Sequence, residues 1–218
     1  MTLMNTDALQ TNSIAAARLA ASWLLSYPDD LLLSRLDEIA AAVAELPPST
    51  GDPLQSFLDH VHGTPLIEIQ QHYVMTFDMK RKASPYLSYW TDGDTRNRGR
   101  AILRFKQAYL EVGFDLGSEE LADHLCVVLE FAAVGDSLTG NALLAEHSGA
   151  IHLLRDALAG MESAYVHVLD SVIATLPSLT PEIRERMAHL AASGPPVEQV
   201  GLEPYGVSIS IEPIGSRR

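Results

Sequence analysis

Apolar residues recur at spacings of three and four positions along almost the whole chain, and this periodicity restricts the fold more than any other feature of the sequence. The spacing is typical of helices that bury one face and expose the other. The stripes cover residues 14–25, 33–43, 54–61, 66–77, 102–112, 121–132 and 151–176. A last helix is expected to begin at Thr180, a suitable cap, with Pro181 in the first helical position. We therefore predict an all-α fold, a helical bundle.

The C-terminal segment differs in composition from the rest of the 218 residues. Residues 1–192 are long enough for one domain with a substantial core. Residues 193–218 are rich in Pro and Gly and lack helical periodicity, so a flexible, irregular tail is expected. The alternation in "YGVSISIEPI" is strand-like, but a lone strand without a partner sheet is expected to be disordered. The prediction is a single helical domain, 1–192, followed by a tail, 193–218.

Charge is distributed unevenly along the chain. The formal net charge is −13, yet eight basic residues lie between Lys80 and Lys106, where the acidic residues are Asp92 and Asp94. This basic segment therefore carries +6 and the remainder −19. Such a balance disfavours nucleic acid and anionic membranes as partners and favours basic peptides. Two interpretations of the basic segment stay open: it contacts an acidic partner surface, or it neutralises nearby carboxylates through Arg–Asp pairs.

The sequence contains no recognisable catalytic or metal-binding motif. A single cysteine, Cys126, excludes an internal disulfide and lies in an apolar run, where a small buried residue is expected. Neither the pair His60 and His62 nor the pair His147 and His152 has the spacing of a zinc motif, so these are interpreted as surface histidines. Phosphate-binding and nucleophile-elbow motifs are missing from the sequence. We expect no enzyme, no metal and no cofactor.

The start of the chain and its hydropathy indicate where the protein acts. "MTLMNTDALQTNS" has no basic stretch followed by an apolar run, so no signal peptide is expected. No apolar run approaches the roughly 20 residues that cross a bilayer. A cytoplasmic protein without stable membrane insertion is the prediction.

The stretch "EELADHLCVVLEF" gives the first candidate site. A helix starting near Ser118 would turn three apolar residues toward the core, namely Leu121, Leu125 and Val128. At about 100° per residue, Asp123 would then point away from the core, with His124 at the edge of the buried stripe. Acidic residues in a first helical turn also stabilise the helix dipole, which is a sufficient structural explanation. The alternative is a carboxylate–imidazole pair at the edge of a groove that receives a basic peptide.

Three blocks resemble one protein family. "YVMTFDMKRKASPYLSYWTDGDTRNRGRAILRFKQAYLEVGF" followed by "ELADHLCVVLEFAA" is similar to the nitrate reductase delta subunit family, within the wider TorD/DmsD-like redox-enzyme chaperones. The earlier "LLSYPDD" resembles the end of that family's first helix. The resemblance covers roughly residues 15–176. One departure is Ala122, where the family commonly has proline, and alanine permits the same helical turn.

The resemblance implies a helical chaperone that binds the N-terminal segment of an unfinished alpha subunit of respiratory nitrate reductase. It would assist molybdenum cofactor insertion and then release its client. The implied groove is apolar with polar ends, in the manner of helix-in-groove recognition. Its expected residues are Tyr73, Phe77, Asp78, Tyr86, Tyr89, Glu120, Asp123 and His124. A chaperone for another molybdoenzyme, or a helical nucleic-acid-binding regulator that uses "TRNRGR", are the alternatives, and the oligomeric state stays open.

Overall fold

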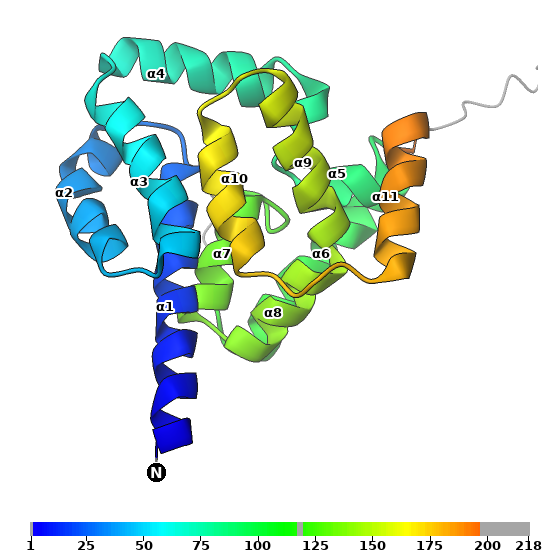
Figure 1. Cartoon of the computed structure of the whole chain (residues 1–218). Helices are drawn as coiled ribbons and strands as arrows, with labels where there is room; N and C mark the ends of the chain where they lie inside the picture. Colours follow the sequence, from blue (N-terminus) through cyan, green and yellow to red (C-terminus); the bar gives the residue numbers. More distant parts are fainter. Residues whose placement is uncertain (1, 117–119, 197–218) are drawn as a thin grey trace, which may run out of the picture.

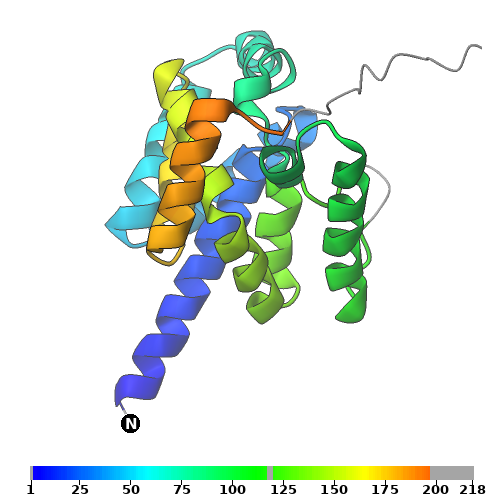
Figure 2. The same ribbon diagram turned by 90° about the vertical axis from the view of Figure 1, so that its right-hand side faces the viewer.

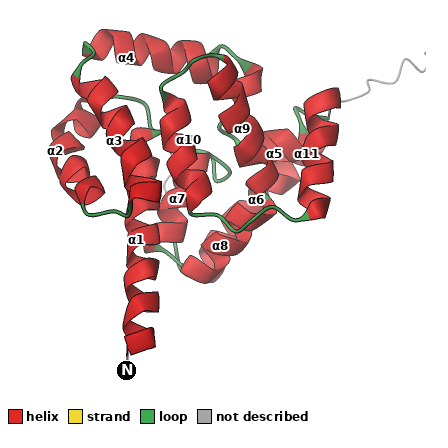
Figure 3. Cartoon of the chain, in the orientation of Figure 1, coloured by secondary structure: helices red, strands yellow, loops and turns green. Residues whose placement is uncertain are grey.

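The computed structural model describes residues 2–116 and 120–196, with side chains from residue 10 onward. Within these ranges the chain is helical and forms no strand (Figures 1 and 3), which confirms the all-α prediction. The strand-like run near residue 209, the tail beyond residue 196 and the expected cap at Ser118 lie outside the described residues.

The described chain folds into a succession of short and medium-length helices. They are α1 (Thr2–Leu24), α2 (Asp30–Ala44), α3 (Pro48–His62), α4 (Leu66–Tyr73), the π-helical turn η1 (Val74–Asp78), the 3-10 turn η2 (Arg81–Ala83), α5 (Leu87–Asp92), α6 (Arg96–Glu111), α7 (Leu125–Val134), α8 (Ser137–Glu146), α9 (Ser148–Gly160), α10 (Tyr165–Ala174) and α11 (Pro181–Ser193). Several consecutive helices pack against each other, namely α1 with α2, α2 with α3, α5 with α6, α7 with α8 and α9 with α10.

Several helices begin where a polar side chain satisfies free backbone N–H groups. Asp29 accepts a hydrogen bond from the N–H of Leu32 (2.8 Å) at the start of α2. Thr180 accepts one from the N–H of Ile183 (3.3 Å), and Pro181 occupies the first position of α11. The predicted start of the last helix is therefore confirmed.

Helix α7 forms the centre of the molecule. Its buried residues are Leu125, Cys126, Val127, Val128, Leu129, Phe131 and Ala132. A helix that is apolar on nearly all sides needs neighbours all round. It contacts α1 and α8, while α10 packs against α1, α3 and α9. The N-terminal half of α1 extends beyond this body (Figure 1).

Helix α6 lies at the edge of the body. Its inner face buries Ala101, Phe105 and Tyr109. The centroid of the Tyr109 ring lies 4.4 Å from that of the Phe131 ring in α7. The same helix packs against α5. In Figure 2, α6 stands at the right-hand side of the molecule with its other face outward.

One predicted helix is wrong, because the stripe at 151–176 is divided between α9 and α10. Helix α9 ends at Gly160 and α10 begins at Tyr165. Between them Glu162 has a positive φ of 52°, which a continuing helix does not permit. The apolar periodicity continues across the break because both helices bury one face in the same core.

The histidines differ in exposure from one another. His147, expected at the surface, is only 6% exposed, since it lies between α8 and α9 with its ring 4.9 Å from that of Phe105. His62 is exposed as expected, and His60 is partly buried. Cys126 is buried and unpaired, as the sequence predicts.

No helix in the described part of the chain has both the length and the apolarity needed to cross a bilayer. Across the described residues there is also no group of three or more His, Cys, Asp or Glu side chains placed to hold a metal ion.

Candidate functional site

Two segments that are distant in the sequence meet through their backbones. Residues 85–88, which lead into α5, run antiparallel to residues 122–125, which lead into α7. Tyr86 and His124 form an isolated bridge, and the N–H of Leu87 donates to the carbonyl of Asp123 (2.9 Å). We call this pairing the Tyr86–His124 bridge. It brings five of the eight predicted site residues together in space although they are far apart in the sequence, and the other three lie in α4 and η1.

Asp123 is the buried polar centre of the bridge. It is 0% exposed, and its Oδ2 accepts hydrogen bonds from both the N–H (3.2 Å) and the hydroxyl of Ser88. Its Oδ1 is buried and accepts no hydrogen bond from the described residues. The prediction that Asp123 points outward is wrong, because α7 begins at Leu125 and helical counting does not apply to the turn before it. Leu121, expected in the core, is 43% exposed.

His124 caps α7 and is almost completely buried. Its Nδ1 accepts a hydrogen bond from the N–H of Cys126 (3.2 Å), so the neutral ring carries its proton on Nε2. Burial lowers the pKa of His124, and the nearby charges of Glu120 and Asp123 partly oppose this shift. The ring meets that of Tyr86 edge to face with centroids 5.0 Å apart. The sequence placed His124 at the edge of the buried stripe, whereas it lies inside the core.

Tyr86 is half-buried and links the bridge to the exposed Glu120. Its half-buried hydroxyl donates to Oε1 of Glu120 (3.4 Å), which also accepts from the N–H of Leu121 (2.8 Å). Burial, followed by the charge of Glu120, raises the pKa of Tyr86 to about 12. The guanidinium of Arg98 lies 5.3 Å from the centre of the Tyr86 ring, a cation–π contact from the inner side of α6.

Three more predicted residues lie at the end of α4 and in η1. Tyr73 and Phe77 are buried, with ring centroids 5.9 and 4.9 Å from that of Tyr165. Asp78 ends η1 and is exposed. Burial raises the pKa of the Tyr73 hydroxyl above its usual range, and the charges of Asp78 and Glu120 add to the shift. Carboxylates from two different segments thus raise the pKa of Tyr73.

Tyr89 is half-buried on α5, where its ring centroid lies 6.1 Å from that of Trp90. Sequence reasoning missed Ser88, Arg98 and Tyr165 as parts of this region. The basic segment was a general signal for Arg98. No local pattern marked Ser88, because its role depends on a partner 35 positions away.

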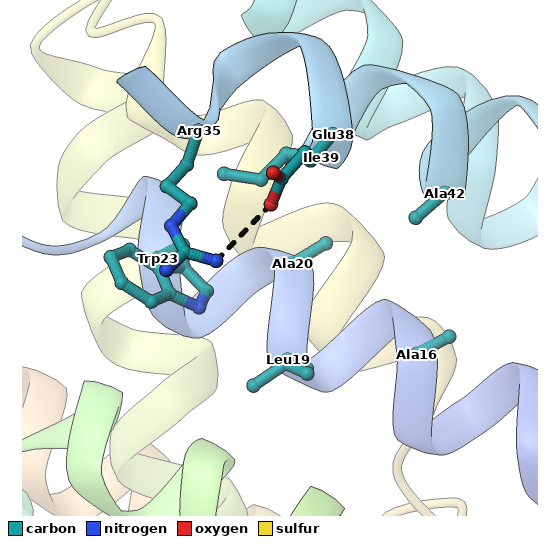
Figure 4. Close-up of a pocket in the computed structure, with 8 residues that line it drawn as sticks. All are labelled: Ala16, Leu19, Ala20, Trp23, Arg35, Glu38, Ile39 and Ala42. Carbon is teal, nitrogen blue, oxygen red and sulfur yellow. Dashed lines mark hydrogen bonds and ion pairs between the residues drawn. The ribbon is translucent and has the colours of Figure 1, made fainter. Parts of the chain in front are cut away.

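A separate hollow lies between α1 and α2, away from the bridge. It has a volume of about 220 Å³ and is lined by Ala16, Leu19, Ala20, Trp23, Arg35, Glu38, Ile39 and Ala42 (Figure 4). Arg35 stacks 5.7 Å from the Trp23 ring centre and pairs with Glu38 (3.1 Å), so the charges at the rim offset each other. No predicted site residue lines this hollow.

Comparison with known proteins identifies a family match that includes the region of the bridge. The family model of the nitrate reductase delta subunit matches residues 43–170, well over half of the sequence. The chain belongs to the nitrate reductase delta subunit family. Every predicted site residue of this delta-subunit-family chain falls within the matched range.

Relatives with curated names agree with the family. A nitrate reductase-like protein NarX of Mycobacterium tuberculosis (strain H37Rv) is 36% identical over 155 residues, which is 71% of this chain. The matched part is only 23% of that relative's length. A probable nitrate reductase molybdenum cofactor assembly chaperone NarJ of Bacillus subtilis is 29% identical over 73% of this chain and 88% of its own. NarJ of Escherichia coli K12 is 30% identical over 70% of this chain and 66% of its own.

The Tyr86–His124 bridge combines buried polar groups with carboxylates on neighbouring exposed residues. Asp78 and Glu120, which lie outside the bridge itself, are exposed carboxylates, and the hydroxyl of Tyr86 donates to Glu120. Beneath them, Asp123 and His124 hold the backbone in place through hydrogen bonds. Such groups accept hydrogen bonds from cationic or N–H donors of a ligand.

Proposed function

We propose that this protein is an assembly chaperone for the catalytic (alpha) subunit of a respiratory nitrate reductase. It binds the unfinished subunit, including its N-terminal segment, and assists molybdenum cofactor insertion. The observation that carries the proposal is the delta-subunit family match over residues 43–170, supported by relatives named as assembly chaperones. We infer that it acts in the cytoplasm by binding and release, without catalytic turnover and without a cofactor of its own.

The surface around the bridge is the proposed docking site for the client segment. Asp78, Glu120 and Tyr86 supply polar contacts, and the exposed side chains of Met75, in η1, and Met79, directly after it, flank Asp78 in the sequence. Flexible, polarisable methionines suit variable apolar partners. A client helix with an apolar face and a basic end fits this combination. Asp123 and His124 support the surface from beneath.

Titration calorimetry with a synthetic peptide of the alpha subunit's N-terminal segment tests the site. The double variant Glu120→Gln/Asp78→Asn is expected to bind about tenfold more weakly, since exposed charge pairs are each worth up to about 1 kcal/mol. Glu185→Gln, an exposed position on α11, is the matched control and should bind as the wild type does. Equal affinity of all three proteins would place the docking site elsewhere.

The identity of the client needs a separate experiment. The tagged protein is recovered from cells grown with nitrate at low oxygen, and the co-purifying subunit is identified by mass spectrometry. A nitrate reductase alpha subunit is expected. Recovery of a different molybdoenzyme would keep the chaperone role and replace its client, whereas recovery of nucleic acid would contradict both.

A further inference from the structure

The outer face of α6 combines exposed leucines with positive charge. Leu103 is 63% exposed and Leu110 is 56% exposed, although α6 already has a buried inner face. At about 100° per residue, these two leucines point within about 20° of each other, at the centre of the outer face. Arg100 and Lys106 flank them at about 60° on either side. Arg104 lies farther round on the Arg100 side.

The positive charges on this face are not used within the described structure. Arg98, on the inner side, pairs with Asp94 (3.2 Å). Arg100 bonds only the neutral amide of Asn97, and neither Arg104 nor Lys106 forms an ion pair with a described residue. Internal neutralisation therefore does not explain these three cations.

A hollow lies at the flank of α6 on the Arg104 side, between α6 and the end of α5. Its volume is about 440 Å³, and it is lined by Asp92, Asn97, Arg100, Ala101 and Arg104. Gly99, also on this face, has no heavy atom of a neighbouring element within 4 Å of the position a Cβ would occupy. The surface thus has room for side chains of another molecule beside Arg100 and Arg104, and open space at Gly99 on the leucine face.

We propose that the outer face of α6 is a second docking surface, which binds an acidic amphipathic segment of a partner protein. Carboxylates of that segment pair with Arg100, Arg104 and Lys106, and its apolar side chains cover Leu103 and Leu110. Exposed leucines between cations select a protein over a phosphate or a nucleic acid backbone, which would leave them in water. The −19 carried by the rest of the chain repels extended polyanions further.

This surface is distinct from the one proposed for the client's N-terminal segment. Arg98 and the bridge lie on the inner side of α6, whereas Leu103 and Leu110 point outward. The two sites also attract opposite charges, since the bridge presents carboxylates. Both can therefore be occupied together by different parts of one partner.

The test uses the full chain and a fluorescein-labelled 16-residue peptide of Glu and Leu with leucines at helical spacing. Fluorescence anisotropy is expected to show salt-sensitive binding. Arg100→Glu/Arg104→Glu should weaken it at least tenfold, and Leu103→Ser several-fold. The control Arg184→Glu/Arg186→Glu on α11 changes the net charge equally and should stay within twofold of wild type. Thermal melts check that each variant is folded.

Several results would overturn the proposal. If the wild-type protein does not bind the peptide, or binds a peptide of scrambled sequence with the same affinity, the proposed surface does not exist. If Leu103→Ser binds the peptide with wild-type affinity, the attraction depends on charge alone. If tripolyphosphate or single-stranded DNA displaces the labelled peptide at lower concentrations than the unlabelled peptide does, the surface is an anion site. If light scattering shows a dimer that the Arg100→Glu/Arg104→Glu variant abolishes, the occupant is a second copy. Calorimetry with the alpha-subunit peptide should be unaffected by these variants, so failure of one site is separable from failure of the other.

Discussion

At the scale of single residues, Asp123 joins two distant backbone segments through one carboxylate. Asp123→Ala removes two hydrogen bonds to a buried carboxyl group and leaves the N–H of Ser88 buried without a partner. We expect a loss of about 3 kcal/mol in the free energy of unfolding, measured by urea denaturation. Asp123→Asn retains an oxygen that accepts from Ser88 and should lose only about 1 kcal/mol.

The exposed Asp37→Ala is the control for Asp123 and should stay within about 0.5 kcal/mol of wild type. A small effect of Asp123→Ala would mean that the bridge forms without its carboxylate. If Asp123→Asn is as stable as the wild type but binds the client peptide more weakly, the Asp123 side chain contacts the client directly.

The Asp123 position shows why part of the candidate site escaped sequence reasoning. The pattern around it predicted a helix that contains Asp123, whereas α7 begins only at Leu125. Whether the carboxylate faces water or the core depended on where α7 begins and on Ser88, and neither is encoded locally. Arg18 is a similar case: the residue is 3% exposed, and its guanidinium donates hydrogen bonds to Thr175 and Asn141, both more than 120 positions away.

Buried histidines predict a pH dependence of stability. Burial lowers the pKa of both His124 and His147 in the folded protein below the value of about 6.5 of an unfolded chain. The unfolded state therefore binds more protons, so stability is complete above pH 6.5 and falls as the pH decreases below it. Each histidine adds a slope of up to about 1.4 kcal/mol per pH unit.

Urea unfolding between pH 7.5 and 5 measures this slope. His147→Gln is expected to reduce it, while His62→Gln, at an exposed position, should leave it unchanged. A slope that is identical in the two variants would assign the pH dependence to other groups.

At the scale of elements, the crossing of α7 and α8 depends on one glycine. A Cβ at Gly140 would overlap both the backbone and the side chain of Ala132 in α7. Gly140→Ala must push the two helices apart, and we expect a loss of about 2–3 kcal/mol. Gly99→Ala, in open space on α6, should instead gain about 0.5–1 kcal/mol, because alanine favours helix. Equal thermal melting of the two variants would contradict this account.

Most helices could be predicted from the sequence because the 3.6-residue period is a local property. The boundary between α9 and α10 could not, since the same core receives the apolar residues on both sides of Glu162. The start of α7 was misplaced for a related reason. Leu121 continues the apolar spacing of the helix but lies in the preceding turn, outside the core.

At the scale of the whole molecule, the described core lies between Ala17 and Thr175. Helix α11 has no buried residue, and Pro196 packs closely against Gly93 at the end of α5. Truncation after Pro196 removes residues 197–218 and should lower the melting midpoint by only a few degrees. Truncation after Ser193 also removes the contact with Gly93 and should cost slightly more. Loss of the helical circular dichroism signal after the first truncation would show that the segment belongs to the core.

The packing of α1 on α7 and α10 has a consequence for biosynthesis. About 100 residues separate the end of α1 from the start of α7, and about 140 separate it from α10. At a synthesis rate of roughly 5–20 residues per second, α7 is completed on the order of 5–20 s after α1. Helix α1 can pack against α2 and α3 as soon as these have been synthesised. The part of its surface that packs against α7 and α10 stays uncovered until those helices follow.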